Sequence, residues 1–140
     1  MAATSSPRSP DAALLLLRLG LGVVMLLHGI FKLYHGVEWI TGPLSAHGLP
    51  GFLAYGTYVA ELVAPLLVIL GAGTRLAALT IAFDLFGAIV LVRSGGVLSV
   101  NQGTGAWGIE VEALIIIVSL AIVLAGPGRF RLIKTSPPWD

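Results

Sequence analysis

Four apolar stretches, each close to the length that crosses a lipid bilayer, set the limits on what this chain can fold into. They cover residues 12–34, 52–70, 75–92 and 107–125. A transmembrane helix needs about 20 residues to cross a hydrocarbon core of about 30 Å. Backbone polar groups in lipid must be satisfied internally, which favours helices over irregular structure. The pattern therefore predicts an all-α membrane protein, a bundle of four transmembrane helices.

The connections between these stretches are rich in glycine, proline and serine, which interrupt helices. We expect breaks at residues 35–51, 71–74 and 94–106, and an end to the last helix at Gly126-Pro127-Gly128. The expected division of the chain is a disordered N-terminal tail (1–11), a four-helix transmembrane domain (12–128) and a cytoplasmic C-terminal tail (129–140).

Composition agrees with a membrane location. Hydrophobic residues make up 56% of the 140 residues and charged residues only 11%, whereas a soluble domain carries about 25% charged residues. A net charge of +1 gives no reason to expect a nucleic-acid partner. The absence of cysteine excludes disulfides, thiolate metal sites and dithiol–quinone exchange.

Basic residues predict the orientation of the bundle, because lysine and arginine concentrate in cytoplasmic segments. The end that holds both termini has Arg8, Arg75, Arg129, Arg131 and Lys134, and the opposite end has only Lys32 and Arg93 nearby. We therefore expect both termini in the cytoplasm and the two longer connections on the outside.

Glu61 is the most informative residue for function. It lies near the middle of the second stretch, where a charged side chain costs roughly 2.5–3.5 kcal/mol on insertion scales. Pro65 follows four residues later and has no N–H, so the carbonyl of Glu61 loses its helical partner. An acid and a freed carbonyl at one depth predict a polar site inside the bundle.

Other ionisable residues are expected to converge on this site from separate helices. Those in the middle and outer half of the bundle are His28, Lys32, Asp84, Glu110 and Glu112, whereas Arg18 lies toward the cytoplasmic half. The simplest arrangement pairs Lys32 with Glu110 and brings His28 to Glu61. Glu110 and Glu112 are about 160° apart on a helix, so we expect at most one of them to point inward.

Each of these residues also has a structural alternative. Arg18 and Lys32 could extend to the interfaces, and His28 could be a hydrogen-bonding residue of the fold. Asp84 could be a protonated acid bonded to backbone, and Glu112 could face the headgroups. No metal site is expected, because the paired Glu-x-x-His motif of metal-binding helical bundles is missing.

Short motifs along the chain resemble those of the DoxX family. They are Arg18-Leu19-Gly20, His28-Gly29, Lys32-Leu33, Gly48-Leu49-Pro50, Glu61-Leu62, Leu70-Gly71, Thr74-Arg75-Leu76-Ala77, Glu110 and Gly126-Pro127-Gly128-Arg129. Each is weak alone, but their order and spacing over residues 15–132 are fairly specific. Asp84 lies outside the family pattern, and Phe130-Arg131-Leu132 replaces the acidic residue that usually follows the last motif.

The resemblance implies a small multi-pass protein of the inner (plasma) membrane. Family relatives include the membrane subunit of a thiosulfate–quinone oxidoreductase, and others are linked to redox and oxidative-stress systems. The family positions that this chain matches are Arg18, His28, Lys32, Glu61, Arg75 and Glu110.

We therefore expect a membrane subunit of a redox system that binds a quinone or similar small molecule in a polar pocket. Glu61 and His28 would exchange protons, as acids and imidazoles do in quinone chemistry, and Lys32 or Arg18 would hold a carbonyl or anion. A partner oxidoreductase subunit would supply electrons, and no covalently bound cofactor is expected. This chain would then be either a quinone-binding or a non-catalytic subunit of that complex.

Two alternatives stay open. A membrane-embedded acid also suits a proton-coupled transporter, and a polar network can serve only the packing of a membrane anchor or assembly factor. The small residues Gly56, Ala60 and Ala64 share one face of the second helix, which would serve either packing within the bundle or a homodimer.

Overall fold

The computed structural model describes residues 8–136 and 138–140, and most of the polypeptide there is helical. The elements in order are α1 (Arg8–His35), α2 (Glu38–Ala46), η1 (Gly51–Tyr55), α3 (Gly56–Tyr58), η2 (Val59–Val63), α4 (Ala64–Leu70), α5 (Thr74–Leu91), η3 (Ser94–Gly96) and α6 (Glu110–Ala125). The expected disordered tail falls mainly on residues 1–7, outside the described residues, and helix α1 already begins at Arg8.

Within the described residues, three helical segments are long and apolar enough to cross a membrane. They are Pro10–His35, Gly51–Leu70 and Thr74–Leu91. Only 28–33% of the most apolar window of each segment is buried within the protein. The remaining apolar side chains face outward, as they do in a membrane protein whose helices contact lipid.

Helix α6 is the shortest of the four long segments. Its 16 residues rise about 24 Å at 1.5 Å per residue, less than the 30 Å of a typical hydrocarbon core. The helix begins at Glu110, three residues after the predicted start at 107. The fourth predicted span is therefore a helix, but it is not one of the three segments that meet the length requirement.

The second membrane segment changes its helical geometry three times. It starts as a 3₁₀ turn in η1, continues as α-helix, and widens into a π-helical turn at Val59–Val63 before α4. At the end of the wide turn, the N–H of Ala64 donates to the carbonyl of Val59, five residues earlier. Pro65 follows directly, so the π turn and the missing proline donor loosen the helix where Glu61 lies.

The connection at 35–51 was expected to lack helix, and this is wrong for its central part. Helix α2 occupies Glu38–Ala46 and has Pro43 inside it. Ile40 and Leu44 from one face of α2 are buried in a small cluster with Val37 and Ala54. This tertiary packing outweighs the low helix propensity of glycine and proline.

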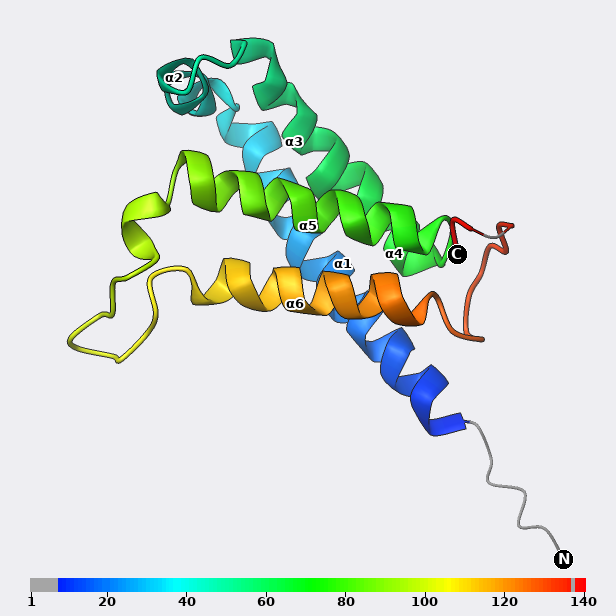
Figure 1. Cartoon of the computed structure of the whole chain (residues 1–140). Coiled ribbons are helices and arrows are strands. Elements are labelled where there is room, and N and C mark those ends of the chain that lie inside the picture. The colour runs from blue at the N-terminus through cyan, green and yellow to red at the C-terminus, as the bar shows by residue number, and fades with distance from the viewer. Residues whose placement is uncertain (1–7, 137) are drawn as a thin grey trace, which may run out of the picture.

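Figure 1 shows α5 and α6 side by side, with α1 crossing behind them and α4 next to α5. Alanines 64, 77 and 78 are buried between α4, α5 and their neighbours, and their small size lets the helices approach closely. The α4–α5 turn, the end of α6 and the C-terminal residues lie at one end of the molecule. Helix α2 and the loop that follows α5 lie at the other end.

Candidate functional site

Lys32 and Glu61 form an ion pair between α1 and the π turn. The Lys32 Nζ lies 2.6 Å from Glu61 Oε1, and the side chains are only 14% and 6% exposed. The same ammonium lies 5.9 Å from the ring centroid of Trp39 in α2, within the range of a cation–π contact. Lys32 thus turns toward the protein interior, and its charge compensates that of the buried acid.

Gly29 allows α1 to come close enough for this pair. A Cβ atom at this position would lie 2.5 Å from the carbonyl oxygen of Glu61 and 2.8 Å from its carbonyl carbon. Only a glycine hydrogen fits there without a shift of the backbone. The carbonyl that Pro65 leaves without a helical donor is therefore covered by the backbone of α1.

Asp84 of α5 is the third member of this group, which we call the acid cluster: Lys32, Glu61 and Asp84. Its carboxyl group lies near that of Glu61 and near the charge of Lys32. When both acids are ionised neither can donate, and the buried Oε2 of Glu61 then has no hydrogen-bond partner. The structure therefore joins three of the predicted site residues, from three elements.

The predicted pairing of these residues is wrong in two respects. Lys32 pairs with Glu61 instead of Glu110, whose Oε2 accepts from the N–H of Trp107 at 3.1 Å. His28 directs Nδ1 to the carbonyl of Val24, at 3.0 Å, in place of the expected contact with Glu61. For Glu110 the reason is the late start of α6, which places it at the first position of the helix, where its carboxylate reaches the N–H of Trp107 in the preceding turn.

Arg18 takes no part in the acid cluster. It is 1% exposed and donates to the carbonyls of Val68 and Ile69 at 2.8 and 2.9 Å, in the last turn of α4. It also donates to the carbonyls of Pro127 and Phe130, both at 2.6 Å. With these contacts Arg18 caps the end of α4 and fastens the segment that follows α6, so the expected role in holding a substrate is wrong for this residue.

Arg75 and Asp140 complete the polar contacts at the same end. Arg75 Nη1 donates to the carbonyl of Val123 near the end of α6, at 2.6 Å. Asp140 pairs with Arg131 at 2.7 Å and accepts from the N–H of Thr135 at 2.9 Å. Burial would raise the pKa of the Asp140 carboxyl, but the bonds from Thr135 and Thr74 and the charge of Arg131 hold that pKa below its usual range.

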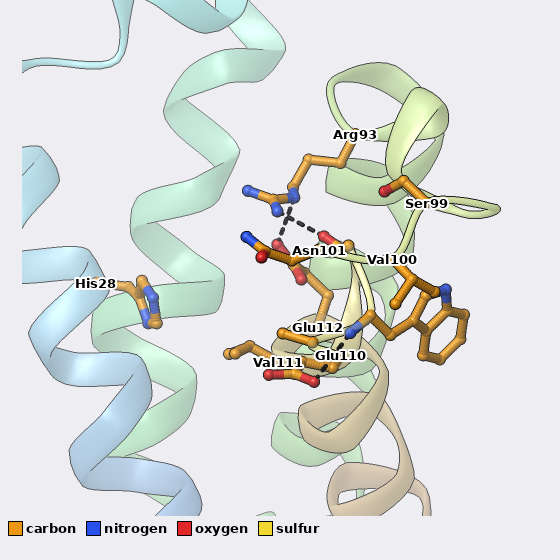
Figure 2. Close-up of a pocket in the computed structure, with 11 residues that line it drawn as sticks. His28, Arg93, Ser99, Val100, Asn101, Glu110, Val111 and Glu112 are labelled. Atoms are coloured by element: carbon orange, nitrogen blue, oxygen red, sulfur yellow. Dashed lines mark hydrogen bonds and ion pairs between the residues drawn. The ribbon is translucent and has the colours of Figure 1, made fainter. Parts of the chain in front are cut away.

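His28 and Glu110 instead line a cavity of about 630 Å³ at the opposite end of the molecule. We call it the outer cavity. Figure 2 shows His28 projecting from α1 on one side, with Arg93, Asn101 and the glutamates of α6 on the other. Its other lining residues are Ser99, Val100, Ala106, Trp107, Gly108, Val111 and Glu112. A volume in this range suits a small organic ligand.

The wall formed by the loop after α5 is held by its own hydrogen bonds. Arg93 pairs with Glu112 at 2.9 Å and donates to the carbonyl of Gly108 at 2.6 Å. The ring N–H of Trp107 donates to the carbonyl of Val97 at 2.7 Å. The Asn101 side-chain oxygen accepts from the N–H of Gly103, at 2.8 Å, which leaves its amide nitrogen available. Both glutamates of the first turn of α6 line the cavity, but Glu110 is exposed and only Glu112 is partly buried, in agreement with the prediction that at most one points inward.

Sequence reasoning did not select Arg93, Asn101 and Trp107 as site residues, because the loop at 94–106 is rich in glycine and serine and has no regular periodicity. The sequence did contain two signals of an ordered turn. Asn101 stands two residues before Gly103, and the aromatic residue Trp107 comes two residues after Gly105. Among the described residues, no group of three or more His, Cys, Asp or Glu side chains is placed to hold a metal ion.

Comparisons with known proteins agree with the motifs. The DoxX family model matches residues 13–94, more than half of the chain. A Bacillus subtilis (strain 168) protein described as "Putative oxidoreductase CatD" is 30% identical over 119 residues, which cover 85% of this chain and 83% of that protein. A Mycobacterium tuberculosis (strain ATCC 25618 / H37Rv) protein described as "Uncharacterized membrane protein Rv3486" is 36% identical over 146 residues, covering 94% and 88%. No solved structure matches the chain. This chain is a membrane protein that belongs to the DoxX family.

Proposed function

We propose that this protein is an inner-membrane subunit of a redox system and binds a quinone or a similar small molecule in the outer cavity. The observation that carries the proposal is the position of His28, an imidazole that lines a cavity of about 630 Å³ opposite Asn101 and Arg93. Family membership and a relative named as an oxidoreductase support a redox role.

The hydrogen bond of His28 defines what its free nitrogen can do. A backbone carbonyl only accepts, so the Nδ1 atom bonded to Val24 carries a proton. In the neutral imidazole Nε2 is then an acceptor, which can take the proton of a hydroxyl group such as that of a quinol. After protonation Nε2 is a donor and can return that proton to a quinone oxygen.

The opposite wall offers groups for the second oxygen of such a ligand. The amide nitrogen of Asn101 is a hydrogen-bond donor, and the guanidinium of Arg93 adds positive charge that Glu112 partly balances. The sequence has no cysteine to relay electrons. We therefore assign electron transfer to a partner oxidoreductase subunit, with this chain binding the ligand and exchanging its protons.

The proposal includes a four-span topology with both termini in the cytoplasm. Helix α6 packs along α5 and, together with residues 107–109, would cross the bilayer as the fourth span. Arg75, Arg129 and Lys134 lie at the end that holds the C-terminal segment, as the positive-inside rule requires of a cytoplasmic face.

Quinone titration tests the proposed site. Purified protein in lipid nanodiscs is titrated with a short-chain benzoquinone, and binding is followed by quenching of tryptophan fluorescence. We expect His28→Ala to weaken binding about tenfold, or ~1.4 kcal/mol, through loss of one ligand hydrogen bond. His47→Ala is the matched control, because His47 makes the same bond to the carbonyl four residues earlier but does not line the cavity.

Equal binding by wild type and His28→Ala would contradict the proposal. The variant Trp107→Phe shows which tryptophan the quinone quenches. Trp107 lines the cavity, so this variant should lose most of the fluorescence quenching if the quinone binds there.

A further inference from the structure

We infer that Glu61 and Asp84 together form one proton-binding site, in which a single proton is held between the two carboxyl groups and Lys32 balances the remaining negative charge. The inference concerns the acid cluster and not the outer cavity. It therefore stands whether or not a quinone binds to this protein.

The first argument is the unsatisfied oxygen of Glu61. Oε1 accepts from Lys32 at 2.6 Å, whereas Oε2 is buried and lacks a donor. Buried carboxylate oxygens without a donor are costly. The carboxyl group of Asp84 lies near that of Glu61, and a proton on either acid would supply the missing donor.

The second argument is the charge of the cluster. Glu61 is 5% exposed and Asp84 is partly buried. The charged groups that act on Asp84 are Glu61 from the π turn and Lys32 from α1. With both acids ionised the three groups sum to −1 inside a membrane protein, and with one proton bound they sum to zero. Two carboxylates that share a site cannot readily both ionise.

The surroundings of the cluster keep this arrangement in place. The ammonium of Lys32 also lies 5.9 Å from the ring centroid of Trp39, and the backbone carbonyl of Lys32 accepts from the hydroxyl of Tyr58 at 3.2 Å. The backbone of Glu61 packs against Gly29. Because the ammonium is fixed beside one oxygen of Glu61, the proton is directed to the side that faces Asp84.

Infrared spectroscopy of the purified full-length chain in nanodiscs tests the inference. We expect a C=O stretching band of a protonated carboxyl group at neutral pH, which shifts in D₂O and has the intensity of one group per chain. The band should disappear in Asp84→Asn and in Glu61→Gln, since each variant leaves one acid that pairs with Lys32 as an ion. Glu38→Gln, at an exposed acid in α2, is the matched control and should retain the band.

Absence of the band from the wild type would overturn the inference, and so would a band that Asp84→Asn leaves unchanged. If the variants fail to fold, isotope-labelled wild type decides the question. The band should shift when the side-chain carboxyl carbon of either aspartate or glutamate is ¹³C-labelled, and a band that responds to neither label refutes a protonated carboxyl. A failure of quinone binding leaves all of these results unaffected, so the two proposals are tested separately.

Discussion

Gly29 determines how closely α1 can approach the π turn that carries Glu61. The contact at this position has no room for a methyl group, because a Cβ would meet the backbone carbonyl of Glu61 as well as the end of the Leu62 side chain, and only the side chain can move aside easily. A single residue without chemical function thereby sets the distance across which Lys32 reaches the acid. The same contact covers the carbonyl of Glu61, to which Pro65 cannot donate because proline has no N–H.

We predict that Gly29→Ala destabilises the protein by about 1–3 kcal/mol, the usual range for overpacking. Gly20→Ala in the same helix is the control, because a Cβ there meets nothing within 4 Å and alanine favours helix. Denaturant unfolding in mild detergent, followed by circular dichroism, measures both. Equal stability of the two variants would show that the close approach of α1 to Glu61 is not required.

At the scale of elements, two arginines hold the ends of helices where three chain segments meet. Arg18 binds carbonyls of α4 and of the segment after α6, and Arg75 binds carbonyls near the end of α6. The final carbonyls of a helix have no internal partner and carry partial negative charge, so cations there are stabilising. The planar guanidinium can serve several carbonyls at once, which an ammonium of the same charge cannot.

We predict that Arg18→Lys preserves the charge but loosens this end of the molecule. Its four hydrogen bonds come from three nitrogen atoms of one guanidinium, and a lysine cannot reproduce that geometry. Hydrogen exchange followed by mass spectrometry should show faster exchange in residues 68–73 and 127–133. Arg129→Lys, at an exposed side chain, should leave exchange there unchanged. Unaltered exchange in Arg18→Lys would mean that the capping bonds contribute little.

At the scale of the whole molecule, the residues of the candidate site lie toward one end and the helix-capping arginines at the other. The outer cavity and α2 lie at the end away from the C-terminal segment, and Lys32 of the acid cluster lies near Trp39 of α2. Whether these ends face opposite sides of the membrane depends on α6, whose 16 residues are short for a span.

We predict that Thr104 and Lys134 lie on opposite sides of the membrane, because α6 separates them. The natural chain has no cysteine, so a single cysteine introduced at either position is the only reactive thiol. In intact cells an impermeant maleimide should label Thr104→Cys, and Lys134→Cys should react only after the membrane is permeabilised. Labelling of both positions in intact cells would place them on the same side and exclude α6 as a span.

The sequence by itself determined the helical membrane class, three of the spans within a few residues, and the buried position of Glu61. These follow from length, hydropathy and the position of an acid among apolar neighbours, which are local properties of the chain. The family also followed from motifs in order along the chain.

The tertiary structure alone decided which charged residues meet. Lys32 pairs with Glu61 because Gly29 and the π turn bring two helices together at that level, and neither effect can be read from spacing in one helix. His28 lines the outer cavity because a loop more than 65 residues later folds against the start of α6. Pairing depends on the rotation and separation of helices, which are set by packing between segments distant in sequence.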